Sequence, residues 1–389
     1  MGYPDVSNLV GRTEKNYKMK IIRIIARLNI GGPSIHISNL CNLQNMGHQT
    51  VLIYGATSPG EGDMAYLLKD KNVKTHYVPE LGREISFLKD IKTFWKIYKI
   101  IRKEKPDIVH THTAKAGMLG RAAAKFAGVK KIYHTFHGHV FHGYFSPLKT
   151  KFFIVLEYLL SLVSTKIITL NTQQQNEIAS FTGINKDKFV VVPLGFDLAK
   201  LQALPNIVDK NKPLRIGIVG RLTAIKNHTL FVEVLKNIYK NKFSFTAEII
   251  GDGELRKEIE KQIEHYGLQT HVTFRGWVTN TAEIYKNLDY LFLTSLNEGT
   301  PVAVIEAMAA RKVVITTPAG GVVDIANHGQ NGFVSKDFTA ESFTDAFLQS
   351  IEISPEEVEK ILGNAQKTAE QFSLATLLAN INNLYTTGK

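Results

Sequence analysis

One run of the sequence combines two carboxylates with the expected start of a helix. Residues 297–309 read NEGTPVAVIEAMA, which places Glu298 in a loop and Glu306 in the body of an Ala-rich helix. Pro301 suits the first turn of that helix. Backbone N–H groups of Gly299 to Val302 could hold a phosphate there, and carboxylates accept hydrogen bonds from sugar hydroxyls. The run indicates a nucleotide-sugar site, although Glu306 alone is equally typical of a solvated helix residue.

A pair of cations follows another expected strand near the middle of the chain. In the run GRLTAIK, Arg221 stands at a strand end and Lys226 at a helix start. A planar guanidinium and a mobile ammonium at these positions could bind one pyrophosphate together. From spacing alone, two solvated surface cations are the more frequent outcome.

The loop NIGGPS at residues 29–34 follows the first expected strand and precedes a helix. Gly31 and Gly32 would let the backbone approach a phosphate or a sugar, and the helix start offers N–H groups to an anion. The spacing differs from the G-x-G-x-x-G pattern of dinucleotide sites. A simple tight turn is an equal alternative.

Histidines are concentrated in the first half of the chain, where a metal site has to be considered. No cysteine lies near them, because the only cysteine is Cys41, and strand alternation sends neighbouring side chains to opposite faces. We therefore predict no metal site. For His110 and His112, which end a strand, we expect packing or hydrogen bonding. Two groups stand out, namely His110 and His112 at that strand end, and His134, His137, His139 and His142 within nine residues.

Short β-branched runs alternate with helix-length segments along nearly the whole chain, which predicts parallel βαβ units. Because such sheets bind ligands at the carboxyl ends of their strands, we expect the site there, in a cleft between two domains. The expected strands are Lys20–Arg27, Gln49–Tyr54, Lys74–Val78, Asp107–His110, Lys131–Thr135, Lys166–Leu170, Lys188–Val192, Leu214–Gly220, Phe245–Ile250, His271–Phe274, Tyr290–Thr294 and Val313–Thr316. Helices are expected to close the chain near Ala340–Ile351, Pro355–Gln371 and Leu374–Tyr385.

The length of 389 residues is too great for one ordinary core and suits two domains. A stretch without periodicity near residues 193–213 marks the boundary. We expect a loose extension at residues 1–18 and a first α/β domain at 19–200 that includes the C-terminal helix 373–389. The second α/β domain is expected at 201–372. A hydrophobic content of 44% and a mean hydropathy of −0.07 exclude disordered, collagen-like and multi-span membrane classes.

The net charge of +12 is unevenly distributed. Residues 1–200 contain 28 Lys and Arg against 14 Asp and Glu, which gives +14, whereas the rest contains 19 against 21, which gives −2. Such asymmetry predicts a negatively charged partner: a nucleic acid, an anionic membrane or a phosphorylated substrate. No recognised nucleic-acid module accompanies the charge, so we expect no nucleic-acid partner.

Two stretches of the first half interleave cations with aromatic residues. Residues Arg83–Lys105 form one expected helix, and Phe141–Phe153 follow the second group of histidines. Both compositions are typical of anionic membrane surfaces, although the first is equally typical of an ordinary domain helix. The longest apolar stretch, Phe152–Val163, contains Glu157 and is too short to span a bilayer. Because no signal peptide is evident, the expected location is the cytoplasm, with peripheral association on the inner membrane face.

Taken together, the motifs resemble family 4 glycosyltransferases of the GT-B fold. The resemblance rests on six patterns in the family's order: Gly31-Gly32, the strand end DIVHTH at 107–112, TFHG at 135–138, Arg221 with Lys226, GDG at 251–253, and Glu298-x7-Glu306. It implies two Rossmann-like domains facing across a cleft, with the C-terminal helix crossing back to the first. It also implies a retaining enzyme of the bacterial surface-polysaccharide type that uses a nucleotide sugar, usually UDP-linked, and requires no metal or other cofactor.

The resemblance also implies roles for individual residues. Glu306 would bind the ribose hydroxyls and Glu298 the donor sugar, while Arg221 and Lys226 would hold the diphosphate and stabilise its developing charge. His137 would lie beside the donor sugar. The implied catalytic set is His137, Glu298, Arg221 and Lys226; the implied donor-binding set is Gly31, Gly32, Arg221, Lys226, Trp277, Val278, Glu298, Gly299, Thr300, Pro301, Val302 and Glu306, with the base near Trp277 and Val278 mostly on backbone groups.

We therefore expect transfer of a hexose or N-acetylhexosamine to a glycan or a polyprenyl-diphosphate-linked acceptor. Glu298 is expected to position the sugar electrostatically rather than to act as a nucleophile. A nucleotide-sugar epimerase or hydrolase on the same fold is the alternative, and it would need no acceptor. A GDP-linked donor also remains open, as do the sugar, the acceptor and the linkage.

Overall fold

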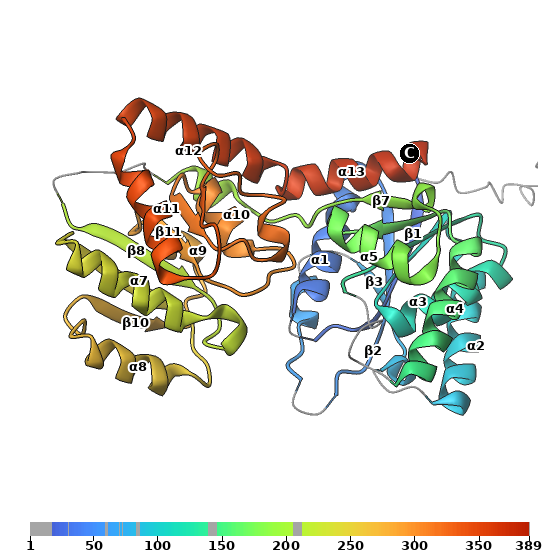
Figure 1. Ribbon diagram of the computed structural model, residues 1–389. Coiled ribbons are helices and arrows are strands. Elements are labelled where there is room, and N and C mark those ends of the chain that lie inside the picture. The colour runs from blue at the N-terminus through green and yellow to red at the C-terminus, as the bar shows by residue number, and fades with distance from the viewer. Residues whose placement is uncertain are drawn as a thin grey trace, which may run out of the picture. The chain divides into compact units, whose positions relative to one another are not determined.

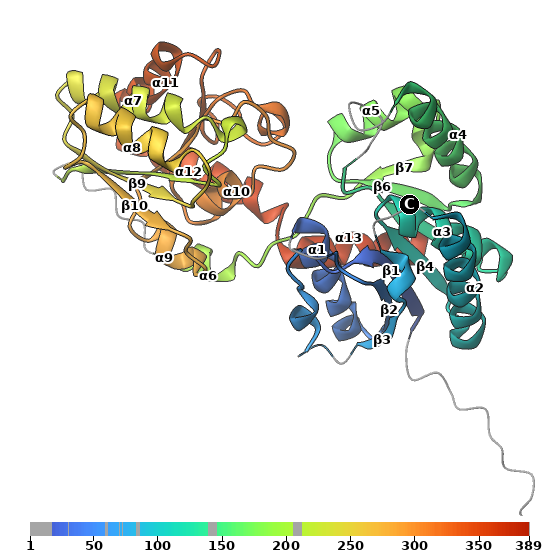
Figure 2. The ribbon, with the colours of Figure 1, turned by 90° about the horizontal axis from the view of Figure 1, so that it is seen from below.

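The computed structural model describes residues 18–29, 31–58, 61–69, 71, 73–82, 86–138, 146–204 and 212–388. The chain divides into two compact units (Figures 1 and 2). The first comprises Met1–Thr169, Gln174–Val190 and Asn382–Lys389, and the second comprises Leu170–Gln173 and Val191–Ile381. The two-domain α/β architecture predicted from the sequence is therefore confirmed.

The first unit is built on a seven-stranded sheet with the order β3-β2-β1-β4-β5-β6-β7. The recorded strand registers, which run from β3 across to β6, are all parallel. Its strands are β1 (Lys20–Arg27), β2 (Gln49–Gly55), β3 (Lys74–Tyr77), β4 (Ile108–His112), β5 (Lys131–Thr135), β6 (Lys166–Thr169) and β7 (Phe189–Val191); its helices are α1 (Gly32–Cys41), α2 (Phe87–Glu104), α3 (Ala114–Phe126), α4 (Pro147–Val163) and most of α5 (Thr172–Thr182).

Alternation along β1 assigns the two faces of this sheet. Ile22 and Ile24 belong to a core that includes α2 and α3, whereas Ile25 belongs to a separate cluster with Ile37 of α1. Because both faces are covered, β1 is an almost continuous apolar run, KIIRIIAR. The exception is Arg23, which is fully buried.

The second unit has a six-stranded parallel sheet with the order β10-β9-β8-β11-β12-β13. Phe292 of β11 faces a core formed with α7 and α11, and Leu293 faces a core formed with α10. Its strands are β8 (Leu214–Val219), β9 (Phe245–Ile250), β10 (Val272–Gly276), β11 (Tyr290–Leu293), β12 (Val313–Thr316) and β13 (Phe333–Val334); its helices are α6 (Ala199–Gln202), α7 (His228–Lys240), α8 (Arg256–His265), α9 (Thr281–Tyr285), α10 (Val302–Ala309), α11 (Ala340–Glu352) and α12 (Pro355–Glu370).

The domain limits differ from those expected at residue 200. Residues from Val191 group with the second unit, because Leu198 and Leu201 beside α6 pack into its core. Helix α13 (Leu374–Thr387) is shared: it groups with the second unit up to Ile381 and with the first from Asn382. The strand β13 was not predicted, since two residues give no periodicity. The expected extension at residues 1–18 lies outside the described residues, except for Lys18.

In the described part of the chain, no helix is long and apolar enough to span a bilayer. Glu157, which interrupts the apolar run of α4, is buried and accepts both hydrogen bonds of a bidentate pair from Arg121 Nη2 of α3, at 2.9 and 2.7 Å. Arg121 is also fully buried. The pair joins α3 to α4, and Figure 1 shows these helices side by side.

We predict that Glu157→Gln destabilises the first unit by roughly 3–5 kcal/mol, because it leaves the buried Arg121 charge without a counter-ion. Urea unfolding in a Trp277→Phe background measures this, since Trp95 of α2 is then the only tryptophan. The matched control is Lys92→Gln, which removes a contact between the exposed Lys92 side chain and Glu80 in the same unit and should cost less than about 1 kcal/mol. Equal effects in the two variants would contradict the account.

Candidate active site

The second unit brings its chemically interesting residues to the point where the strand order reverses. Strands β8 and β11 are hydrogen-bonded neighbours at the centre of the sheet, and their following segments leave in opposite directions. Arg221 and Lys226 follow β8, while Ser295 and Glu298 follow β11. Open α/β sheets bind ligands in the crevice outside the carboxyl ends of such strands.

An ion pair connects these two segments. Lys226 Nζ lies 2.6 Å from Glu298 Oε1, and the Ser295 hydroxyl donates to the same oxygen at 2.6 Å. The Glu298 side chain is 9% exposed and that of Lys226 is 28% exposed, so the pair is reachable from solvent at the lysine. The sequence predicted Lys226 and Glu298 but missed Ser295, whose position directly beyond a buried strand was the available signal.

The backbone of the two segments is joined as well. The Thr294 hydroxyl donates to the carbonyl oxygens of Lys226 and Asn227 at 3.1 and 3.0 Å, and the Leu296 amide donates to Ile225 at 2.8 Å. These hydrogen bonds fix the backbone of the Lys226 loop relative to the segment that contains Glu298.

Two glycines that follow β12 contact the backbone of the Glu298 loop. The Gly321 amide donates to the Glu298 carbonyl oxygen at 2.8 Å. Gly320 has φ +51°, and a Cβ on either glycine would collide with the backbone of residues 298–299. Only glycine allows this close approach, which sets the position of the Glu298 loop.

Glu306 lies in the body of α10 and is held by a tyrosine that the sequence analysis did not identify. The Tyr285 hydroxyl of α9 donates to Glu306 Oε2 at 2.9 Å. Burial raises the pKa of the Glu306 carboxyl, and the hydrogen bond from Tyr285 opposes that rise. A carboxylate of this kind is an acceptor fixed in place for a hydroxyl donor.

The remaining predicted donor residues lie at strand ends and at the start of α10. Arg221 is exposed and lies 3.5 Å from Glu254, so the structure does not bring it onto Lys226 or Glu298. Trp277 follows β10 and is 68% exposed, whereas the neighbouring Val278 packs against the core. Pro301 is the N-cap of α10, and the helix begins at Val302. Gly299 and Thr300 lie in the loop just before Pro301.

In the first unit, the Gly31–Gly32 loop opens α1 as predicted. Gly31 is the N-cap, with φ +152°, a conformation that favours glycine. The Ser34 hydroxyl donates to the Asn29 carbonyl oxygen at 2.6 Å and closes the loop. Ile30 lies outside the described residues.

Three histidines meet at the carboxyl edge of the first sheet: His36 from α1, His112 from the end of β4 and His137 after β5. His112 Nδ1 lies 3.1 Å from His137 Nε2. The His36 ring packs edge-on against both, with ring centroids 5.9 Å from His112 and 5.1 Å from His137. His36 and His112 are buried and His137 is half-buried.

Burial keeps these imidazoles neutral. Burial lowers the pKa of His137 to about 4. Burial also lowers the pKa values of His36 and His112 well below the ordinary value, and the neighbouring histidines and the Arg23 cation lower them further. Buried histidines without a carboxylate partner lose their charge because the charged form is costly to desolvate.

The buried Arg23 lies directly beneath this cluster and connects it to the C-terminal helix. Its guanidinium donates to the Tyr385 hydroxyl at 3.0 Å and lies 3.2 Å from His110 Nδ1. His110 also contacts Tyr385 and lies 2.7 Å from the Thr135 hydroxyl. The predicted hydrogen-bonding role of His110 is thus observed, and Tyr385 extends it to the end of α13.

Among the described residues, His134 does not belong to this group of three. His134 lies 2.9 Å from the Thr111 hydroxyl, and His139 and His142 lie outside the described residues. His112 and His137 were candidates from the sequence, whereas His36 was not. His36 stands inside a helix, so it does not mark the end of an expected strand.

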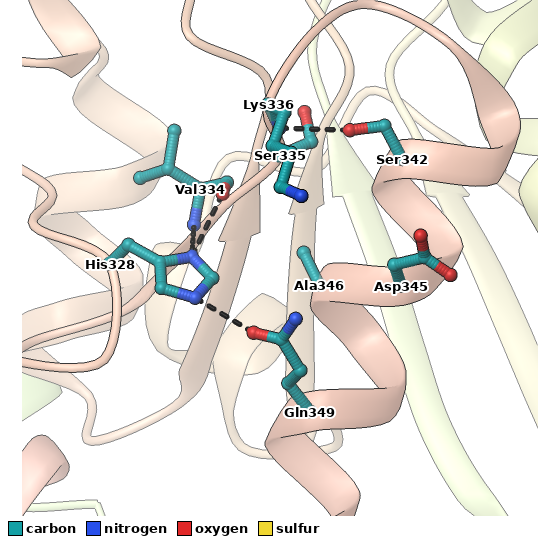
Figure 3. Close-up of a pocket in the computed structure, with 8 residues that line it drawn as sticks. All are labelled: His328, Val334, Ser335, Lys336, Ser342, Asp345, Ala346 and Gln349. Atoms are coloured by element: carbon teal, nitrogen blue, oxygen red, sulfur yellow. Dashed lines mark hydrogen bonds between the residues drawn. The ribbon is translucent and has the colours of Figure 1, made fainter.

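A pocket in the second unit lies apart from all these residues. It is formed by residues of β13 and α11 and the segments before them, with His328 bonded to Gln349 at 2.8 Å and Ser342 to the Lys336 amide at 2.8 Å (Figure 3). Its polar groups bond to one another, and none of the predicted site residues lines it.

Comparison with known proteins places both units in one family. Residues 30–200 match Glycosyltransferase Family 4 and residues 203–368 match Glycosyl transferases group 1. A relative from Escherichia coli named UDP-Gal:alpha-D-GlcNAc-diphosphoundecaprenol alpha-1,3-galactosyltransferase is 30% identical over 329 residues, covering 81% of this chain and 84% of the relative. The chain belongs to glycosyltransferase family 4.

Further comparisons agree. The Staphylococcus aureus capsular polysaccharide biosynthesis glycosyltransferase CapM is 25% identical over 81% of this chain and 86% of its own. The crystal structure of Anabaena Alr3699/HepE in complex with UDP superposes with a TM-score of 0.79 at 20% identity, covering 95% of this chain and 100% of that one. The predicted GT-B fold and transferase class are therefore confirmed, and this family 4 glycosyltransferase has its candidate residues at the strand ends of both domains.

We predict that Tyr285→Phe raises the pKa of Glu306 further, because the variant removes the hydrogen bond that stabilises the carboxylate while burial persists. The measurement is a pH titration of the ¹³C-labelled Glu carboxyl resonance, assigned by its loss in Glu306→Gln. Tyr239→Phe, which alters an exposed tyrosine of the same unit, is the control and should leave this midpoint unchanged. A midpoint that falls in Tyr285→Phe contradicts the assignment.

Proposed function

We propose that this family 4 glycosyltransferase transfers a hexose or N-acetylhexosamine from a UDP-sugar to a polyprenyl-diphosphate-linked acceptor, with retention of configuration, in surface-polysaccharide assembly. The observations that carry the proposal are the Lys226–Glu298 pair at the switch point of the second sheet and the fixed carboxyl of Glu306 in the helix that follows β11. The printed name of the E. coli relative, with a UDP-sugar and a diphosphoundecaprenol acceptor, supports the substrate class.

The donor would engage this site through three kinds of group. Ribose hydroxyls donate to Glu306, and sugar hydroxyls donate to Glu298. The diphosphate accepts from Lys226, which turns from its carboxylate partner toward the phosphate at little cost because its ammonium is mobile and partly exposed. Arg221, whose exposed side chain lies 3.5 Å from Glu254, would swing to the same phosphates.

The transfer step then needs charge stabilisation more than a protein nucleophile. The bond between the anomeric carbon and the UDP oxygen breaks, and the acceptor oxygen bonds to the same face of that carbon. The acceptor proton passes to the departing phosphate oxygen, so UDP leaves as the second product. Lys226 and Arg221 stabilise the charge that develops on the phosphate. Glu298 positions the sugar, and a covalent glycosyl adduct on Glu298 would contradict this scheme.

The first domain contributes His137 and the Gly31–Gly32 loop in this proposal. A neutral imidazole can accept from or donate to a sugar hydroxyl, and Gly32 presents its backbone to the phosphates without a side chain in the way. We propose that the step needs no metal or other cofactor, since cationic side chains supply the stabilisation.

We predict that Lys226→Ala lowers kcat with UDP-sugar and lipid-linked acceptor by roughly 10²–10³-fold, the usual effect of removing one preorganised stabilising group. Release of UDP, measured by a coupled assay, checks this. The control is Lys240→Ala, which removes an exposed lysine from the end of α7 and should have no effect. Equal UDP release with and without acceptor would instead favour the hydrolase alternative, and conversion to an epimeric UDP-sugar without net UDP release would favour the epimerase.

The acceptor is lipid-linked in this proposal, and the surface of α2, α3 and α4 suits a membrane. These helices lie side by side in both ribbon views (Figures 1 and 2). Exposed apolar side chains recur on α4 every three or four residues, which forms a stripe along one face. We call this surface the α2–α4 face; its exposed apolar residues are Phe87, Leu88, Ile91, Trp95, Phe126, Leu148, Phe152, Val155, Tyr158, Leu159 and Leu162.

Cations accompany this apolar stripe. On α2 the exposed residues include Lys89, Lys99 and Lys103, and on α4 they include Lys149 and Lys151. Apolar groups flanked by cations are the combination that binds an anionic bilayer surface. We therefore propose peripheral association of the first domain with the inner membrane face. Of the sequence stretch Phe141–Phe153, residues 141–145 lie outside the described residues.

We predict that the protein sediments with anionic phospholipid vesicles at low salt and that Lys89→Gln, Lys99→Gln and Lys103→Gln together weaken this binding. Three cations at about 1 kcal/mol each correspond to a loss of roughly 100-fold. The matched control replaces Lys240, Lys257 and Lys261 of the second unit, which are also exposed. Failure to sediment, or equal losses in both triple variants, would contradict the proposal.

A further inference from the structure

We propose that His36, His112 and His137 bind one divalent transition-metal ion, with Zn²⁺ as the preferred ion. The site lies at the carboxyl edge of the first sheet, and its three ligands come from α1, from the last residue of β4 and from the segment after β5. This inference goes beyond the proposed transfer reaction, which needs no metal, and it differs from the sequence-based expectation of no metal site.

The spacing of the nitrogens suits a metal. One nitrogen from each ring lies within 4.8 Å of those of the other two. His112 Nδ1 and His137 Nε2 are 3.1 Å apart, close to the separation of about 3.3 Å expected for two ligands of a tetrahedral zinc ion at roughly 2.0–2.1 Å from it. His36 would turn its ring toward the other two to complete the set.

Unpartnered polar atoms in the cluster point to a missing ligand. Both ring nitrogens of His36 are buried and have no hydrogen-bond partner among the described residues. Buried polar atoms of this kind are rare and call for an ordered water or an ion. An ion bound by one nitrogen of each ring would use a lone pair of His36 that otherwise has no partner.

The ligand chemistry favours zinc over magnesium or calcium. Neutral imidazole suits zinc, copper and nickel, whereas hard cations prefer oxygen ligands, and no carboxylate belongs to this cluster in the described residues. Three histidines leave a fourth position open, as in zinc sites that bind water or an anion. His137 is half-buried, so this open side is the one that solvent can reach.

Arg23 sets a limit on the affinity. Its buried cation interacts with His36 and His112 and disfavours additional positive charge, so we expect weaker binding than in closed structural zinc sites. It also predicts that an anion such as inorganic phosphate occupies the fourth position and strengthens binding of the ion.

Metal binding would compete with the role of His137 in transfer. An imidazole whose lone pair ligates zinc cannot accept from a sugar hydroxyl. This consequence rests on the proposed function, and it predicts that Zn²⁺ inhibits transfer while chelation does not.

The direct test is titration of the metal-free full-length protein with Co²⁺, whose visible absorption reports tetrahedral nitrogen ligands, followed by displacement with Zn²⁺. We expect one ion per chain. His36→Gln and His112→Gln each remove a ligand and should weaken binding by at least the roughly 10–100-fold that loss of an outer-shell partner costs. The control His265→Gln alters an exposed histidine of α8 and should leave binding unchanged.

The outcomes separate the possibilities. No stoichiometric absorption with wild-type protein, or absorption that persists in both variants, would overturn the proposal and leave water as the occupant. His137→Gln, at a half-buried position, gives the same test should the two buried variants unfold, as judged by far-ultraviolet circular dichroism. Because absorption is independent of turnover, failure of the metal site and failure of the proposed transferase function are distinguishable.

Discussion

The positions of the central candidate residues depend on one constraint, the reversal of strand order at the centre of each parallel sheet. In the second domain the reversal lies between β8 and β11, and Lys226 and Glu298 follow those two strands. In the first domain it lies between β1 and β4, and His36 and His112 come from the same two strand ends. Loops that leave in opposite directions create a crevice, and the buried strands beneath hold its walls at fixed positions.

The strand-end residues of the two domains differ in their charge. The second domain places a cation against a carboxylate, a pair that a diphosphate and sugar hydroxyls can exchange for their own contacts. The first domain buries neutral imidazoles above Arg23 and shields them from protonation. The ion pair at the described strand ends therefore lies in the second domain, and neutral imidazoles lie in the first. Exposed lysines of the first domain lie on α2 and α4, and we propose an anionic membrane as their partner.

The sequence predicted much of the fold because buried parallel strands are apolar runs with polar residues at their ends. β1, β5, β9 and β12 have the expected limits, and β13 was missed because two residues give no period. Side-chain partners were less accessible: Tyr285 and Ser295 hold Glu306 and Glu298 through contacts that only tertiary folding creates. His36 was missed for the same reason, since its helix brings it to strand ends that are distant in sequence.

A crystal structure of the protein with a bound UDP-sugar tests the central claim most directly. The account predicts ribose hydroxyls within hydrogen-bond distance of Glu306, and a diphosphate contacted by Lys226 and by Arg221, with Lys226 turned away from Glu298. A nucleotide bound elsewhere, or a diphosphate that leaves the Lys226–Glu298 pair intact and touches neither cation, would contradict it.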